Sequence, residues 1–167
     1  MRTKYPYIII SLLISLFIYL FYRTDRTVVN EIIIRIISFD TYVALKESVI
    51  NFLPLNKFII YSLPEGLWIF CITLTSKPYY VKLFGRRINC LFIPLVFCIS
   101  LEICQLLHFT NGRFDLMDIF ISTLFWLVGV YTFNDKSYKQ NILARLNLDS
   151  TFCIATYSIV YLSHVLK

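Results

Sequence analysis

Apolar runs long enough to cross a lipid bilayer recur along this chain, and they limit the folds it can adopt. A transmembrane helix needs about 20 mostly apolar residues. Runs of roughly that length occupy Tyr5–Tyr22 and residues 58–76, 88–109, 115–133 and 151–166. Hydrophobic residues make up 58% of the 167-residue chain and charged residues only 16%, whereas soluble domains carry about 25% charged residues. The sequence therefore predicts an all-α fold: a polytopic membrane bundle of about five transmembrane helices, with residues 1–167 as a single membrane domain.

The basic residues that flank these runs predict the orientation of the chain. Arg2 and Lys4 precede the first run, which no small-residue cleavage site follows, so we expect it to remain as an anchor. The short connection at residues 77–87 is rich in Lys and Arg, and such connections stay in the cytoplasm. We therefore expect an N-terminus inside the bacterial cytoplasmic membrane and residues 24–57 outside. The net charge of +6 lies at the ends of apolar runs, so we expect no nucleic-acid partner.

The predicted extracytoplasmic segment at 24–57 contains an amphipathic pattern over residues 39–53. Its apolar positions recur at helical spacing: Phe39, Tyr42, Val43, Val49, Ile50 and Leu53. This pattern predicts a helix that lies in the outer membrane interface. Two roles stay open for this helix, a surface that recruits a substrate and a lid packed on the bundle.

Charged and polar side chains interrupt the third and fourth apolar runs and the connection between them. They are Glu102, Gln105, His108, Arg113, Asp115 and Asp118. Ionisable residues inside membrane helices cost roughly 2.5–3.5 kcal/mol each on insertion scales, so they usually mark a functional site or a buried pair. Any function of this chain is therefore expected in this region.

Because few residues separate the third and fourth runs, the sequence predicts a tight antiparallel helix hairpin there. Folding the chain at this connection places Gln105 near Asp118 and Glu102 near Ser122. Glu65, on the second run, lies at about the same depth. We therefore expect acidic and amide groups from three helices to converge in the outer half of the bilayer.

This cluster allows structural and functional interpretations. Asp115 could cap the fourth helix, Arg113 could pair with a neighbouring acid, and Glu102 with Gln105 could hold the helices together. Alternatively, Arg113 flanked by acids suits an anionic group, and paired carboxylates suit acid–base chemistry. Carboxylates and a histidine also suit a divalent cation. No HExxH or comparable spacing supports such a cation, so no metal or cofactor is expected.

The pattern resembles the VanZ-like family of bacterial integral membrane proteins. That family carries Glu, two apolar residues and Gln, then Arg, Asp-x-x-Asp, Asn-Thr and two spaced glycines. The residues at those places here are Glu102, Gln105, Arg113, Asp115, Asp118, Thr123 and Gly129, with Ser122 in place of Asn and Phe125 in place of the first glycine. The stretch around Pro64 and Gly66 resembles the proline-glycine entry to an earlier span. The resemblance covers a core at residues 56–133.

The resemblance implies a membrane protein associated with sensitivity to glycopeptide antibiotics such as teicoplanin, and it implies no particular reaction. We expect an outward-facing polar site that binds an anionic cell-envelope or lipid headgroup group, so the expected partner is a membrane lipid or envelope precursor. The site residues would be Glu102 and Asp118 as orienting or proton-moving groups, with Arg113, Asp115, Gln105, Glu65 and His108 as ligand-binding groups. Two alternatives stay open. One is an enzyme that modifies an outer-leaflet lipid or lipid-linked precursor, and the other is a structural or assembly protein.

Overall fold

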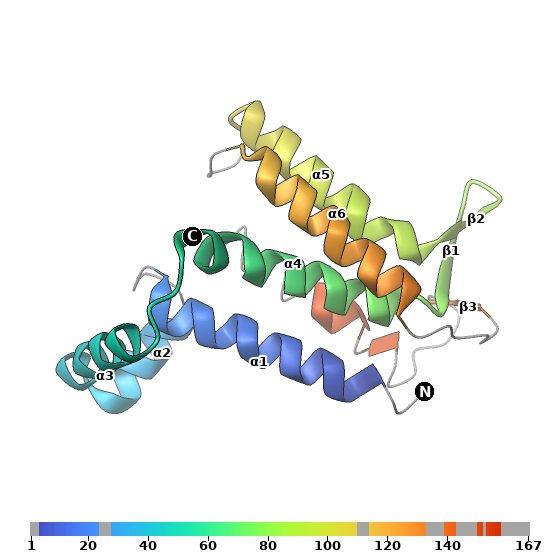
Figure 1. Ribbon diagram of the computed structural model, residues 1–167. Helices are drawn as coiled ribbons and strands as arrows, with labels where there is room; N and C mark the ends of the chain where they lie inside the picture. The colour runs from blue at the N-terminus through green and yellow to red at the C-terminus, as the bar shows by residue number, and fades with distance from the viewer. Residues whose placement is uncertain are drawn as a thin grey trace.

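Six labelled α-helices and a small sheet make up most of the computed structural model of this chain (Figure 1). The structure describes residues 4–23, 28–109, 114–132, 139–142, 150–151 and 153–157. The helices are α1 (Tyr5–Tyr22), α2 (Val28–Ile37), α3 (Phe39–Phe52), α4 (Lys57–Ser76), α5 (Ile93–Leu106) and α6 (Leu116–Tyr131). The strands are β1 (Tyr79–Leu83), β2 (Arg86–Asn89) and β3 (Gln140–Asn141), and a short 3-10 helix, η2, spans Cys90–Phe92.

Helix α4 lies at the centre of the bundle, with α1 along one side and α6 along the other (Figure 1). A buried cluster joins these helices: Ile8 of α1 packs with Phe70, Cys71 and Leu74 of α4, and Phe125 of α6 packs against the group. Helix α5 packs against α6 to form the hairpin that the sequence predicts. Apolar side chains therefore account for the contacts that hold α4 between its neighbours.

Two glycines let α4 and α6 approach closely. A Cβ added at Gly66 would lie 2.5 Å from Cδ2 of Phe125, and one added at Gly129 would lie 2.9 Å from Cγ2 of Thr73. Small residues at a helix crossing allow this approach, which increases van der Waals contact. Phe125, at the position where the VanZ-like pattern has a glycine, fills the space that Gly66 leaves.

Within the described residues, two helices are long and apolar enough to cross a bilayer. They are α1 with 18 residues and α4 with 20, and α4 is the more buried of the two. Helices α5 and α6 are also apolar but shorter, with 14 and 16 residues. The prediction of apolar helices at these four places is confirmed, and the predicted length of the third is wrong.

The third predicted run, at 88–109, becomes a helix only from Ile93 onward. Ile88 belongs to β2, and Cys90–Phe92 form the 3-10 turn. Pro94 lies in the first turn of α5, where the missing N–H of proline removes no helical hydrogen bond. The α-helix therefore starts one residue before the proline, and the apolar residues before it belong to the sheet and the turn.

Of the fifth predicted helix, at 151–166, only the beginning can be compared. Residues 150–151 and 153–157 are helical. Residues 158–167 lie outside the described part of the chain.

Helix α3 confirms the predicted helix in the segment between the first two long runs. Its Tyr42 is 1% exposed and donates a hydrogen bond to the backbone oxygen of Leu20 at 2.6 Å. Lys46 donates to the backbone oxygen of Arg23 at 2.9 Å. Helix α3 thus packs on the C-terminal end of α1, which favours the lid over an independent surface helix. Its location in a membrane interface stays a prediction.

A three-stranded sheet, in the order β2-β1-β3, covers the other end of the bundle. Strands β1 and β2 are antiparallel neighbours joined by Phe84 and Gly85, and β3 runs parallel to β1. Tyr79, Cys90, Ile142 and Cys153 form a second buried cluster beneath it. The prediction of an all-α fold is therefore wrong for this part of the chain, where a basic connection at residues 77–87 was expected.

Candidate functional site

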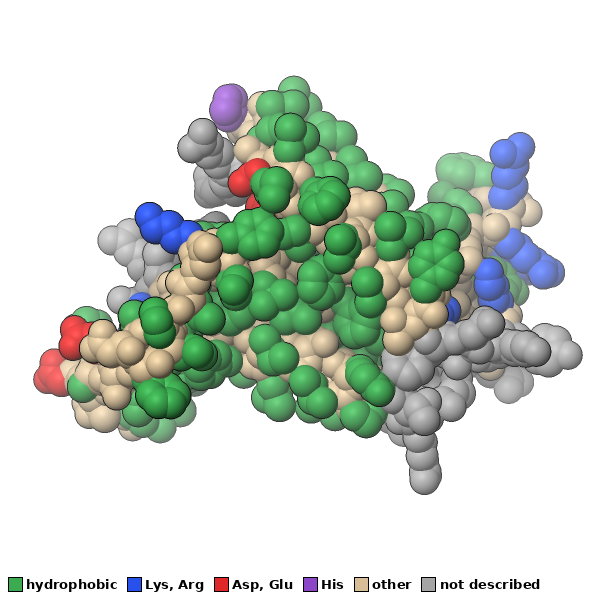
Figure 2. Space-filling view, in the orientation of Figure 1, with side chains coloured by type: hydrophobic (Ala, Val, Ile, Leu, Met, Phe, Trp, Pro, Cys, Tyr) green, Lys and Arg blue, Asp and Glu red, His purple; other side chains and the backbone are tan. Residues whose placement is uncertain are grey.

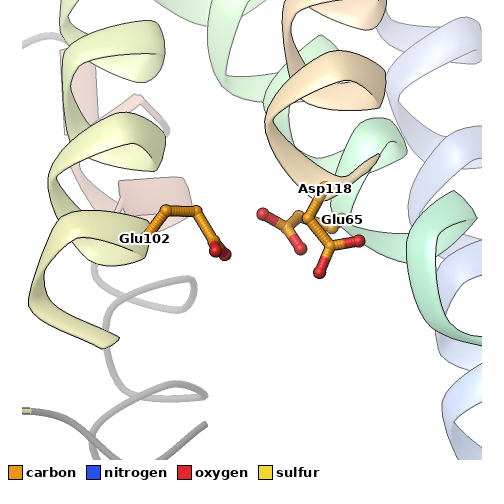
Figure 3. Close-up of side chains that lie close together, drawn as sticks. All are labelled: Glu65, Glu102 and Asp118. Atoms are coloured by element: carbon orange, nitrogen blue, oxygen red, sulfur yellow. The ribbon is translucent and has the colours of Figure 1, made fainter. Parts of the chain in front are cut away.

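Three acidic side chains from three helices converge between α4, α5 and α6. One carboxylate oxygen each of Glu65, Glu102 and Asp118 lies within 4.8 Å of the others. Figure 3 shows the three side chains extending from their helices into a shared space. Glu102 is only 3% exposed, and the other two are half-buried. The structure therefore brings together three of the residues that the sequence places at one depth.

Glu65 points from α4 toward the α5–α6 hairpin. Its Oε1 accepts a hydrogen bond from Ser122 Oγ at 3.4 Å and a weak one from Cys98 Sγ at 3.6 Å. The neighbouring Gly66 lets α6 come close enough for these contacts. Glu65 thus accepts hydrogen bonds from residues of α5 and α6. Pro64, just before it, leaves one backbone carbonyl of α4 without its helical hydrogen bond.

The other two carboxylates each accept one hydrogen bond from a neighbour. Asp118 Oδ1 accepts from Ser62 Oγ at 3.0 Å, and Glu102 Oε2 accepts from the backbone N–H of Asp115 at 3.0 Å. An ionised carboxylate has about four lone-pair positions. These hydrogen bonds therefore leave acceptor capacity on both side chains.

Asp115 caps the N-terminus of α6. Its Oδ1 accepts a hydrogen bond from the backbone N–H of Met117 at 2.9 Å, as expected for an aspartate at an N-cap. Its own N–H is held by Glu102. The structural alternative for Asp115 therefore matches the observed geometry.

The sequence predicts Glu102 near Ser122, and in the structure the hydrogen bond of each side chain is made with another partner. Glu102 faces Asp115 at the start of α6, and Ser122, two helical turns further on, donates to Glu65 instead. The reason is that α5 ends at Leu106 and α6 starts only at Leu116, so the connection is longer than the apolar runs indicate.

The remaining predicted site residues are not among the three clustered acids, and one of them lies outside the described residues. Gln105 is half-buried near the end of α5, and His108 is exposed. His108 follows α5 with φ 58°, and its N–H donates to the backbone oxygen of Gln105 at 3.0 Å, so its backbone helps to end the helix. Arg113, expected to contact the anion, lies outside the described part of the chain.

Arg23 is a site residue that sequence reasoning missed. It follows α1, and its guanidinium lies over the rings of Tyr19 at 4.7 Å and Tyr61 at 5.4 Å. Its Nη2 donates to the backbone oxygen of Tyr61 at 2.7 Å, and its buried Nε makes no hydrogen bond within the described residues. Ser62, the residue after Tyr61, donates to Asp118, so Arg23 and Asp118 contact neighbouring residues of α4. In the sequence, Arg23 is indistinguishable from other basic residues at the end of a span.

Ser62 and Cys98 were also missed. Ser62 lies three residues before Glu65, and Cys98 lies four residues before Glu102, so each shares a helix face with an acid. That spacing is the signal that could have found them. All five cysteines are free, and an apolar setting indicates only a small buried side chain for Cys98.

Three carboxylates this close together need positive charge or hydrogen-bond donors between them. A cation, an amine, hydroxyl groups or a shared proton would each meet that need. Arg23 provides a nearby positive charge that suits a phosphate or carboxylate. The site thus offers an acidic part and a basic part next to each other.

No protein family, curated protein or solved structure matches this chain. The resemblance to the VanZ-like family stays a prediction that rests on residues 56–133.

Proposed function

We propose that this chain is a VanZ-like integral membrane protein in which α1, α4, α5 and α6 form the membrane bundle. Two helices of spanning length and two shorter apolar helices support this proposal. So do the large apolar side chains that remain exposed on the helices, such as Leu13 at 58% and Phe120 at 61%. Figure 2 shows such side chains covering the visible face of the bundle. Water disfavours an apolar surface this extensive, whereas lipid does not.

The proposed function is to bind the polar headgroup of an envelope lipid or lipid-linked precursor at the carboxylate cluster. One observation carries the proposal: acids from three separate helices share a space within 4.8 Å. Acids are costly within a membrane bundle and are retained there mainly for function or pairing. The expected side is the outer face of the bacterial cytoplasmic membrane.

The geometry refines the chemistry of the expected ligand. A group that is only anionic would be repelled by Glu65, Glu102 and Asp118. A phosphate-bearing headgroup with an amine or hydroxyl groups would satisfy both parts of the site. Its phosphate would reach Arg23, whose buried Nε makes no hydrogen bond among the described residues, and its donors would reach the carboxylates.

A thermal-shift experiment with the detergent-purified chain tests this function. The ligands would be phosphatidylethanolamine, phosphatidylcholine, a lipid-linked glycan precursor, and Mg²⁺ alone. We expect one phosphate-bearing lipid with donor groups to raise the melting temperature of the wild type, with a several-fold smaller shift in Glu102→Gln and Asp118→Asn. The variant Glu47→Gln, on exposed α3, is the matched control. Equal shifts in all four proteins would contradict binding at the cluster, and a shift with Mg²⁺ alone would indicate a metal site instead.

A second candidate is an enzyme that acts on the same lipid. The observation that favours it is the sharing of one space by three carboxylates, because one can hold a proton while another accepts one. Such an enzyme would lose turnover of the bound lipid in Asp118→Asn while keeping its melting temperature. Mass analysis of the lipid before and after incubation with the wild type would show whether any reaction takes place.

A further inference from the structure

The hairpin formed by β1 and β2 projects from the end of the bundle opposite the carboxylate cluster (Figure 1). Its cross-strand partners are Lys82 with Arg87 and Leu83 with Arg86. Cross-strand partners point to the same side of a sheet, and successive residues alternate. Lys82 and Arg87 therefore share one face, and Leu83 lies on the other with 49% of its surface exposed.

The charge of this hairpin is entirely basic. Lys82, Arg86 and Arg87 are exposed, and the chain contains no acidic residue between Glu65 and Glu102. Figure 2 shows several basic side chains and no acidic ones at this end, whereas the other end carries both basic and acidic side chains. The guanidinium of Arg87 lies over the ring of Tyr80 at 5.4 Å. Like charges directly opposite each other destabilise a strand pair, so an anion near Lys82 and Arg87 would relieve their repulsion.

The hairpin places a large aromatic residue at its tip. Phe84 is 96% exposed, and both turn residues have positive φ, 48° for Phe84 and 75° for Gly85. Two such residues make a type I′ turn, in which Asn-Gly is strongly preferred. A bulky residue in this conformation is unfavourable. Phe84 therefore strains the turn and exposes an apolar ring to water. Contact with an apolar partner would remove the unfavourable exposure of the ring.

We propose that the β1–β2 hairpin binds the anionic phospholipid surface of the leaflet at this end of the bundle. Phe84 would insert beside the acyl chains, and Lys82, Arg86 and Arg87 would contact the phosphates. The inference rests on the proposed membrane location and concerns a surface separate from the carboxylate cluster. The hairpin joins α4 to α5, so it leaves the bundle at the membrane surface. Aromatic and basic residues together are typical of segments that lie there.

Phe84→Trp in the full-length chain reports the depth of the tip. The variant would be reconstituted into vesicles of phosphatidylcholine alone or mixed equally with phosphatidylglycerol, with bromine on the acyl chains as a quencher. The wild type supplies the background from Trp68 and Trp126. We expect quenching of the added indole to be several-fold stronger with phosphatidylglycerol and to fall at high salt. An added indole that stays unquenched in vesicles containing the protein would overturn the proposal.

Charge variants test the lipid headgroup. Lys82→Gln with Arg86→Gln, made in the Phe84→Trp chain, should weaken the phosphatidylglycerol-dependent part of the quenching by about tenfold or more. Arg35→Gln with Lys57→Gln removes two positive charges at the other end of the bundle and should leave the phosphatidylglycerol-dependent quenching unchanged. Equal quenching in both pairs would overturn the role of these basic residues. A chain that does not float with vesicles would contradict the membrane location, and the hairpin proposal with it.

Phe84→Asn separates binding from folding. Asparagine suits the type I′ turn better than phenylalanine, so the hairpin should form at least as well. We expect this variant to lose most of the rise in melting temperature that phosphatidylglycerol gives the wild type. Phe52→Asn, at an exposed aromatic position of α3, should keep that rise. An undiminished rise in Phe84→Asn would contradict insertion of the ring.

Discussion

Glu65, Glu102 and Asp118 place like charges within 4.8 Å of one another, so they work against folding unless a ligand, proton or cation lies between them. Replacing one acid by its amide removes a charge and keeps an acceptor for the neighbouring donor. In Glu102→Gln, for example, the amide oxygen can still accept from the N–H of Asp115. The site therefore carries a cost in stability that a binding function would explain.

We predict that Glu102→Gln and Asp118→Asn unfold at the same or a higher temperature than the wild type when no ligand is added. Relief of repulsion between carboxylates should contribute about 1 kcal/mol. Thermal unfolding in detergent measures this, with Glu47→Gln as the control. A large fall in the melting temperature of both amide variants would mean that the cluster only locks the helices.

Asp115 contributes separately to the stability of the protein, through its side-chain hydrogen bond at the N-terminus of α6. Asp115→Ala should lower the free energy of unfolding by about 1 kcal/mol, because the N–H of Met117 loses its acceptor. Asp115→Asn keeps an oxygen at that position and should cost much less. Reversible unfolding of the three proteins in a denaturing detergent compares them. Equal losses in both variants would argue that the charge of Asp115, and not its cap, matters.

At the scale of elements, the crossing of α4 and α6 fixes where Glu65 meets Ser122 and Asp118. We predict that Gly66→Ala destabilises the protein by about 1–3 kcal/mol, because the added Cβ meets the ring of Phe125. Phe125→Leu in the same chain should restore part of that loss by making room. A double-mutant cycle on unfolding free energies measures the coupling. Strictly additive losses would show that the two residues do not share a contact.

The elements also show what the sequence could and could not predict. The apolar runs predicted α1, α4, α5 and α6 because burial and lipid exposure both select apolar residues over a helix length. The β1–β2 hairpin was missed, because Phe84 replaces the asparagine that usually marks its turn. Its basic residues also indicated a connecting loop.

Some features of the candidate site could be predicted from the sequence and others could not. Counting residues along the α5–α6 hairpin and along α4 predicted that Glu65, Glu102 and Asp118 lie at one depth. The role of Arg23 could not be predicted, because helical periodicity does not reveal that α1 packs beside α4. The pairing of Glu102 with Asp115 depends on where α5 ends, and boundaries of this kind follow from caps and connections more than from the apolar pattern.

At the scale of the whole molecule, the chain should have its N-terminus inside and its carboxylate cluster toward the outside. We predict that Ser48→Cys reacts with a membrane-impermeant thiol reagent in intact cells and that Lys139→Cys reacts only in inverted vesicles. Four of the native cysteines are buried and Cys104 is half-buried, so the wild type supplies the background. The reverse labelling pattern would invert the proposed orientation and place the cluster on the cytoplasmic side.

The central claim is that the three carboxylates form a binding site for a lipid headgroup. Native mass spectrometry of the protein purified in mild detergent tests it most directly, by comparing lipid retained by the wild type, by Glu65→Gln with Asp118→Asn, and by the control Glu47→Gln. We predict that the wild type and the control retain one phosphate-bearing lipid and that the double variant retains about tenfold less. Equal retention by all three proteins, or no retained lipid in the wild type, would contradict the claim.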